Sequence, residues 1–231
     1  MGGKKFAVLL CAEDPEYVKM KYGGYFGVFL RMLGEEGETW DVYKVACGEF
    51  PDDEEIKTFD GFVITGSCND AHGNDVWILK LLILLQKLNS MKKKILGICF
   101  GHQVPCFLGN GQILIAIRLF DTGAFTGRKT GPAVSGWDMG ITTIHFSSST
   151  KLFSSVIVPA SLAVIECHRT RSVNSHQKQV IAWSDKTGIE MFRYEDHIMG
   201  IQGHPEYNRD ILSHLVDRLL QRNLIVVNTK P

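Results

Sequence analysis

In the first half of the chain, short apolar runs bounded by turn residues alternate with segments of helical pattern. This alternation predicts a parallel sheet with helices on both faces. One segment, 75–88, is apolar on nearly every face, which predicts a buried helix with Asn74 or Asp75 as its N-cap. Parallel sheets of this kind bind ligands at the carboxyl ends of their strands, so functional residues are expected there. The predicted strands are 6–11, 40–45, 61–65 and 94–99, and the other predicted helix is 24–33.

The second half of the chain is rich in β pattern. Five segments predict strands, and Tyr194-Glu195-Asp196 predicts a hairpin turn between the last two. Segment 208–221 has the apolar spacing of an amphipathic closing helix. With 231 residues and no linker composition, we expect one α/β domain over 1–231, with a mostly parallel central sheet and a β-rich C-terminal part. The five predicted strands are 141–145, 163–167, 180–183, 189–193 and 198–202.

The charge balance of the chain argues against one class of partner. Lys and Arg together number 25, as do Asp and Glu, so the formal net charge is zero and nothing favours nucleic acid or an anionic membrane.

The longest apolar stretch, 81–85, is too short to span a bilayer. The six cysteines include no C-x-x-C pair and predict neither a disulfide scaffold nor a zinc site. Because the N-terminal apolar run is assigned to a strand and not to a signal peptide, we expect a cytosolic chain with reduced thiols.

The stretch Gly97-Ile98-Cys99-Phe100-Gly101 carries the strongest chemical signal. A buried strand leads directly into a cysteine flanked by glycines and then into a helix, which is the context of a nucleophile elbow. Glycines relieve the crowding of the sharp turn, the helix N-terminus stabilises a thiolate, and the following backbone N–H is available to an oxyanion. A cysteine after a strand also fits a small buried hydrophobic residue, and this motif alone leaves both interpretations open.

A thiolate used for acyl transfer needs a base, and the base needs an orienting group. Both residue types occur in His204-Pro205-Glu206, near the end of the last predicted strand. Residues two apart in an extended backbone point the same way, and Pro205 favours an extended His204, so the two side chains are expected to project together. The alternative is a surface histidine and glutamate beside a turn.

Together these motifs resemble the class I glutamine amidotransferase superfamily, and within it the plant γ-glutamyl peptidases. The resemblance rests on Gly97-x-Cys99-x-Gly101-x-Gln103, on His204-x-Glu206 and on several longer stretches. It implies a flavodoxin-like fold in which Cys99 is the nucleophile, His204 the general base and acid, and Glu206 the group that fixes the imidazole. The longer stretches are YGGYFGVF, GFVITGSCNDA, ILGICFGHQ, GWDMGITTIH, EMFRYEDHIMGIQGHPEY and ILSHLVDRLL.

The resemblance also implies the surroundings of the nucleophile. The backbone N–H groups of Gly66, Ser67 and Phe100 would form an oxyanion hole, and Gln103 and His168 would contact substrate. A solvated helix residue remains the alternative for Gln103, and a polar residue beside the cleft the alternative for His168. The implied substrate is a small molecule with a γ-glutamyl amide bond, glutathione or a glutathione conjugate, as in plant glucosinolate biosynthesis. The implied reaction passes through a thioester and needs no metal or organic cofactor.

Two patches depart from the family pattern, 105–126 and 170–178. Pro105 is expected to shorten or kink the helix after Cys99, because it lies beyond the first turn. The second patch carries Arg171 and Lys178 and no carboxylate, where the family has acidic residues that hold the substrate amino group. We hypothesise that the first patch is a retained intron and the second a short frame slip in the gene model.

Two other functions remain open at this stage. One is a glutaminase module that passes ammonia to a synthase partner, which the chain disfavours because it carries no synthase domain. The other is a binding protein that keeps the fold and has lost catalysis through the two patches.

Overall fold

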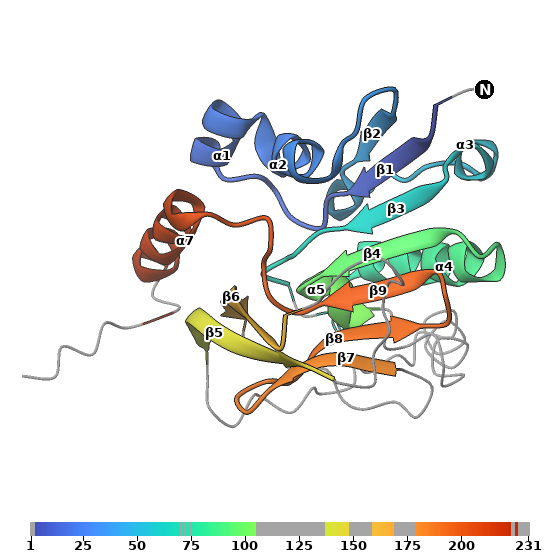
Figure 1. Ribbon diagram of the computed structural model, residues 1–231. Coiled ribbons are helices and arrows are strands. Elements are labelled where there is room, and N and C mark those ends of the chain that lie inside the picture. Colours follow the sequence, from blue (N-terminus) through green and yellow to red (C-terminus); the bar gives the residue numbers. More distant parts are fainter. Residues whose placement is uncertain are drawn as a thin grey trace, which may run out of the picture.

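A nine-stranded mixed sheet forms the centre of the described structure. The computed structural model describes residues 3–69, 71, 73, 75–104, 137–147, 159–168, 179–222 and 225. The sheet has the strand order β2-β1-β3-β4-β9-β8-β7-β5-β6 (Figure 1). Its strands are β1 (Lys5–Leu9), β2 (Thr39–Tyr43), β3 (Gly61–Ile64), β4 (Lys94–Ile98), β5 (Asp138–Phe146), β6 (Ser161–His168), β7 (Gln179–Ser184), β8 (Gly188–Tyr194) and β9 (Ile198–Ile201).

The sheet changes character at β9. All pairings from β2 to β9 are parallel, whereas β9-β8, β8-β7, β7-β5 and β5-β6 are antiparallel. The chain runs from β1 outward to β2 and then returns to the other side of β1 with β3, so the strand order reverses there. The predicted α/β fold with a parallel first half and a β-rich second half is therefore confirmed.

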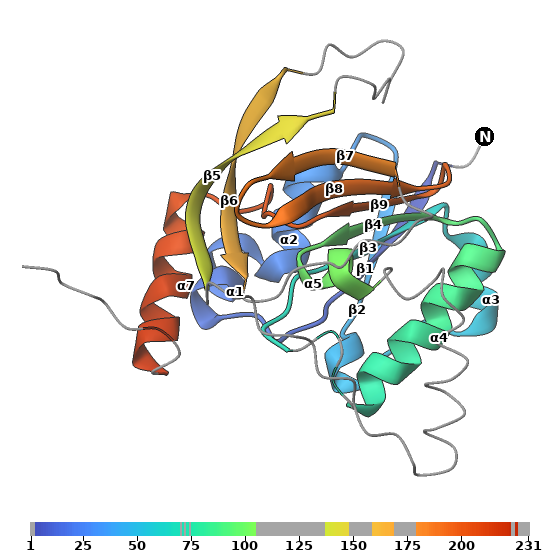
Figure 2. The ribbon, with the colours of Figure 1, turned by 90° about the horizontal axis from the view of Figure 1, so that it is seen from below.

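Helices cover both faces of the parallel strands (Figures 1 and 2). Helices α1 and α2 lie on one face, and α3, α4 and α5 lie on the other. Helix α7 lies beside α1, where the rings of Tyr17 and His214 stack 3.6 Å apart. The helices are α1 (Glu16–Tyr22), α2 (Gly24–Leu33), α3 (Asp53–Thr58), α4 (Val76–Ser90), α5 (Phe100–Gln103) and α7 (Arg209–Gln221), with a short 3₁₀ turn η1 (Val45–Cys47).

The two faces of the sheet carry separate apolar clusters. The larger cluster joins α3, α4 and the start of α5 to one side of β1, β3 and β4. The smaller one packs Phe29 of α2 against Val8, Val63 and Ile98 on the other side. Helix α4 contributes seven buried side chains, which confirms the prediction of a buried helix. Asp75 is its N-cap residue, but its side chain makes no capping hydrogen bond.

Some sequence predictions of local structure need correction. The strand predicted over 40–45 ends at Tyr43, and Val45 already belongs to η1. Helices α1 and α3 were not predicted, although α3 carries a capping box between Asp52 and Glu55. The two atypical patches, 105–126 and 170–178, lie outside the described residues, as does Pro105 with the predicted kink. Within the described part of the chain, no helix combines the length and apolar character needed to cross a membrane.

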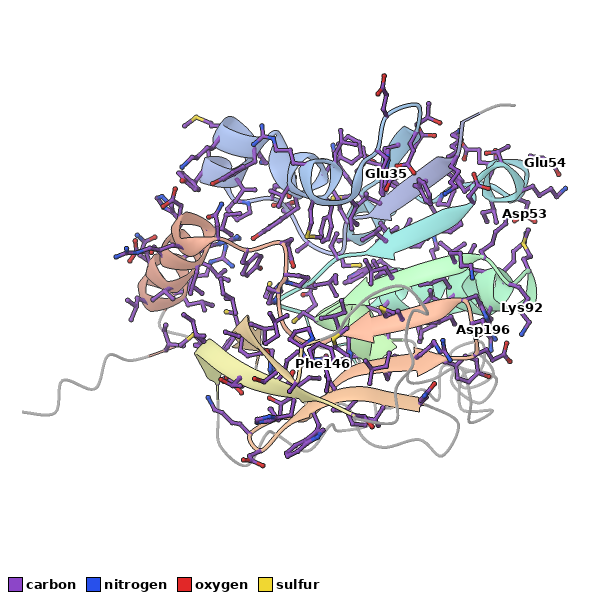
Figure 3. The ribbon with its side chains drawn as sticks, viewed as in Figure 1. Glu35, Asp53, Glu54, Lys92, Phe146 and Asp196 are labelled. Atoms are coloured by element: carbon purple, nitrogen blue, oxygen red, sulfur yellow. The ribbon has the colours of Figure 1, made fainter. Side chains whose placement is uncertain are left out.

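The two ends of the parallel strands differ in chemistry. At the amino end, Lys92 forms an ion pair with Glu195, and the Lys94 Nζ donates to the Asp196 carbonyl over 2.7 Å. Lys92 and Asp196 lie close together at this end in Figure 3. These contacts tie the β8-β9 hairpin to the start of β4. The carboxyl ends of the same strands, at the opposite end of the sheet, hold the residues that the sequence singled out.

Candidate active site

Three neighbouring parallel strands deliver the main site residues to one edge of the sheet. Gly66 follows β3, Cys99 follows β4, and His204 follows β9. These strands are adjacent in the order β3-β4-β9, and their arrowheads point to the same end in Figure 1. Residues far apart in sequence therefore meet at the carboxyl edge, where ligands bind in folds of this type.

Cys99 has the backbone geometry of a nucleophile elbow. Its φ of 52° and ψ of −101° are unfavourable for a residue with a side chain, at a cost of the order of 1–3 kcal/mol. The Cys99 N–H donates to the Ile201 carbonyl over 2.8 Å, which fixes the elbow to β9. A methyl group at Gly97 would lie 2.0 Å from the Gly101 carbonyl oxygen, and one at Gly101 would lie 2.3 Å from the Ile64 carbonyl oxygen. Both glycines are therefore required by close backbone approach.

His204 and Glu206 form a buried pair. The His204 Nδ1 lies 2.8 Å from Glu206 Oε1, and the two side chains are 3% and 2% exposed. The surface alternative for this motif is therefore wrong. The extended-backbone argument is also wrong: Pro205 and Glu206 form a turn, closed by a 3.2 Å hydrogen bond from the Tyr207 N–H to the His204 carbonyl. The turn, and not strand alternation, brings the carboxylate to the imidazole.

The electrostatic surroundings of His204 favour its protonated form. Burial lowers the pKa of the imidazole, but the charge of Glu206 and the interaction with Cys99, which includes a side-chain hydrogen bond, raise that pKa well above its ordinary value. Since Glu206 engages Nδ1, the other ring nitrogen is the one available to the thiol. This arrangement can hold a thiolate beside an imidazolium.

The loop after β3 lies directly against these two side chains. A methyl group at Gly66 would lie 2.9 Å from His204 Cε1 and 3.6 Å from Cys99 Cβ. The Ser67 Oγ accepts the Asn69 N–H over 3.1 Å, which shapes the loop. Phe100 is the first residue of α5, a position whose N–H has no partner within a helix. The backbone N–H groups predicted for an oxyanion hole thus belong to the loop after β3, which lies against Cys99, and to the first residue of α5, which follows Cys99.

Gln103 and His168, the predicted substrate contacts, are both buried. The Gln103 amide donates to Gln202 Oε1 over 3.3 Å and the residue is 5% exposed, so the alternative of a solvated helix residue is wrong. His168 stands at the end of β6, with its Nε2 3.0 Å from Glu166 Oε2. A hydrogen bond joins β6 to the segment that carries His204: the His204 N–H donates to the Ile165 carbonyl over 2.8 Å.

A buried pair of carboxyl groups lies behind the site and was not predicted. Glu166 on β6 and Glu190 on β8 are 0% and 1% exposed, and each carboxyl group acts electrostatically on the other. Burial and the neighbouring charge of Glu166 raise the pKa of Glu190 to about 7. The Ser184 hydroxyl donates to Glu190. A methyl group at Gly203, next to His204, would lie 2.7 Å from Glu166 Oε1, so the pair lies close to the site. The sequence offers no signal for this pair, because its members come from strands that no motif connects.

The remaining described cysteines differ from Cys99 in their surroundings. Burial raises the pKa of the Cys11 thiol, and burial together with Cys99 and Glu166 raises that of Cys167 to about 12. Cys47 and Cys68 are exposed. The part of the chain that the structure describes contains no group of three or more His, Cys, Asp or Glu side chains arranged to hold a metal ion.

The fold and this site define a family. The sequence model of the class I glutamine amidotransferases matches residues 22–215, and the chain belongs to that family. A glutamine amidotransferase from Thermotoga maritima has the same fold, with a TM-score of 0.66 and 17% identity over 97% of this chain and 87% of that one.

Within the family, the chain is similar to plant γ-glutamyl peptidases. It is 45% identical to γ-glutamyl peptidase 5 of Arabidopsis thaliana over 227 residues, which are 96% of this chain and 83% of that protein. It is 43% identical to γ-glutamyl peptidase 3 of the same plant, over 96% of this chain and 84% of that protein. The resemblance stated from the sequence is therefore confirmed.

Proposed function

We propose that the chain hydrolyses γ-glutamyl amide bonds with Cys99 as nucleophile, His204 as general acid and base, and Glu206 as the orienting carboxylate. The observation that carries this proposal is the buried His204–Glu206 pair beside a cysteine in a strained elbow. The named activity of the Arabidopsis relatives supports the choice of a γ-glutamyl substrate.

In the first step, Cys99 Sγ forms a bond to the γ-carbonyl carbon and the carbonyl oxygen becomes an oxyanion. The N–H groups of Phe100 and of Gly66 and Ser67 are the donors that stabilise this charge, an effect worth about 3–4 kcal/mol per donor. As the C–N bond breaks, the His204 imidazolium gives its proton to the leaving amine. The product of this step is a γ-glutamyl thioester on Cys99.

In the second step, water attacks the thioester. The neutral His204 imidazole takes a proton from the water, and the C–S bond breaks to release the γ-glutamyl group as a free acid. The thiolate and the imidazolium return to their starting state. Glu206 holds the ring through Nδ1 in both steps and stabilises its positive charge. Protein groups and water supply every proton, so the mechanism needs no cofactor.

The substrates that we propose are small γ-glutamyl compounds, glutathione or its conjugates, in the cytosol. Gln103, one helical turn after Cys99 on α5, and His168, at the carboxyl end of β6, are the proposed positioning groups. Free glutamine carries the same γ-amide and is the substrate of the alternative function, a glutaminase that supplies a synthase.

The test is turnover by the purified chain of glutathione, a glutathione S-conjugate and glutamine. We expect γ-glutamyl cleavage without a partner protein, abolished in Cys99→Ala. Cys167→Ala is the matched control: it removes a buried thiol beside Cys99 whose pKa of about 12 keeps it protonated, and should retain turnover. Equal activity of Cys99→Ala and the unchanged chain would overturn the proposal. Turnover of glutamine with no cleavage of γ-glutamyl peptides would favour the glutaminase, and a folded chain with no turnover would favour a binding protein.

A further inference from the structure

The ring of Tyr207 lies flat against the imidazole of His204. Their centroids are 4.0 Å apart and their planes differ by 8°. The turn that brings Glu206 to Nδ1 also brings Tyr207 back over the ring, since the Tyr207 N–H donates to the His204 carbonyl. Pro favours the second position of such turns, where Pro205 stands. One turn thus supplies both neighbours of the imidazole.

A second tyrosine supports this stack from another element. Tyr25 of α2 lies over the Tyr207 ring with centroids 6.0 Å apart, and the two hydroxyl oxygens are 3.4 Å apart. The Tyr25 N–H donates to Asp14 Oδ1 over 3.0 Å, which holds the start of α2 in place. A series of contacts, from Asp14 to Tyr25 to Tyr207 to His204, therefore connects the start of α2 to the imidazole.

We propose that Tyr207 is a positioning residue that holds the imidazole of His204 in the plane facing Cys99 and stabilises its protonated form. The inference rests on the proposed function of Cys99, His204 and Glu206. Glu206 restrains Nδ1, but the hydrogen bond to the Cys99 thiol is lost once Cys99 carries the acyl group, and one hydrogen bond only partly restrains rotation of the ring about its Cβ–Cγ bond. A parallel ring at 4.0 Å prevents that rotation, because a tilted imidazole would collide with it.

The Tyr207 ring also acts on the charge of His204. The face of an aromatic ring is electronegative and attracts a cation placed over it. Burial raises the pKa of both Tyr207 and Tyr25, so the phenols stay neutral when the imidazole is charged. The titratable groups around the stack come from several elements: Cys99 after β4, Glu206 after β9, Tyr25 on α2, Asp14 before α1 and Cys167 on β6.

The experiment compares Tyr207→Phe, which keeps the ring, with Tyr207→Met, which fills much of the volume without one. Two readouts are needed: kcat and KM for a γ-glutamyl substrate, and the rate of Cys99 alkylation by iodoacetamide from pH 5 to 10. Peptide mapping separates Cys99 from the exposed Cys47 and Cys68. Tyr207→Leu replaces the methionine variant if the latter does not fold.

We expect Tyr207→Phe to stay within about threefold of the unchanged chain in kcat. Tyr207→Met should lose about 10- to 100-fold in kcat with little change in KM, because the imidazole is misplaced and the substrate is not. The alkaline inflection of the alkylation profile, which reports loss of the imidazolium proton, should move to lower pH by about half a unit or more.

A role in packing alone predicts a different result. A folded Tyr207→Met with unchanged kcat and an unchanged alkylation profile would overturn the inference, as would equal losses in the methionine and phenylalanine variants. Cys99→Ala separates this failure from failure of the proposed function. If Cys99→Ala still turns over substrate, the proposed function is wrong; if it is inactive while Tyr207→Met behaves normally, the role of Tyr207 alone is wrong.

Discussion

Replacement of Glu190 by glutamine should change how the stability of the protein depends on pH. Glu190 is 1% exposed, and burial together with Glu166 raises its pKa from 4.5 to about 7. The folded chain therefore keeps this proton up to about pH 7, whereas the unfolded chain releases it near pH 4.5. Between these values the folded state binds more protons, so the free energy of unfolding falls as pH rises.

The size of the effect follows from the same pKa values. A tenfold change in proton affinity corresponds to about 1.4 kcal/mol, so ionising Glu190 in the folded protein costs up to about 3 kcal/mol. This cost is absent below pH 4.5 and complete above about pH 7. Glu190→Gln cannot ionise, and its amide oxygen can still accept from the Ser184 hydroxyl. We expect it to match the unchanged chain at pH 4.5 and to be more stable by about 1–3 kcal/mol at pH 8.

The assay is urea unfolding of both proteins from pH 4.5 to 8, taking the difference in free energy at each pH. The other titrating groups are present in both chains, and their contributions to the difference cancel to first order. Glu195→Gln is the control, because Lys92 lowers the pKa of this exposed carboxyl. The difference in free energy of unfolding between Glu195→Gln and the unchanged chain should therefore stay nearly constant over this pH range. A difference between Glu190→Gln and the unchanged chain that stays constant with pH would refute the reasoning.

Three further predictions concern the elbow, the orienting carboxylate and the closing helix. Gly101→Ala should destabilise the chain by about 1–3 kcal/mol in urea unfolding, because its methyl group would lie 2.3 Å from the Ile64 carbonyl oxygen; unchanged stability would contradict the close approach. Glu206→Gln should lower kcat by at least about 100-fold with KM nearly constant, since it leaves the imidazolium without its counter-charge; a change confined to KM would count against an orienting role. Asn208→Ala should cost about 1 kcal/mol, because Asn208 Oδ1 accepts the Ile211 N–H as the N-cap of α7; a loss near zero in thermal unfolding would show that the cap contributes nothing.

The strand and helix predictions succeeded where the hydrophobic pattern was long or regular. Helix α4 and the five antiparallel or closing strands lie within a few residues of their predicted ranges, and the predicted hairpin turn joins β8 to β9 at 195–197, one residue later than predicted. Helix α3 was missed because six residues are too few to show a period, and its Asp52–Glu55 capping box was the available signal.

The site was predictable to the extent that it follows from local motifs. The elbow at Cys99 was predictable because a sharp turn after a strand needs glycines on both sides of the cysteine, where a side chain would collide with the backbone. The contact of His204 with Glu206 was anticipated for the wrong reason, since a turn creates it. Tyr207 and the Glu166–Glu190 pair were not anticipated, because ring stacking and the approach of two buried carboxyl groups depend on how separate segments pack.

The most direct test of the proposed chemistry is to trap the acyl group on the enzyme. The chain is mixed with γ-glutamyl p-nitroanilide, quenched in acid during steady state, digested and analysed by mass spectrometry. We predict one γ-glutamyl group on the peptide that contains Cys99, no such group on Cys47 or Cys68, and no adduct or turnover in Cys99→Ala. Turnover with no adduct on Cys99, undiminished in Cys99→Ala, would contradict the account.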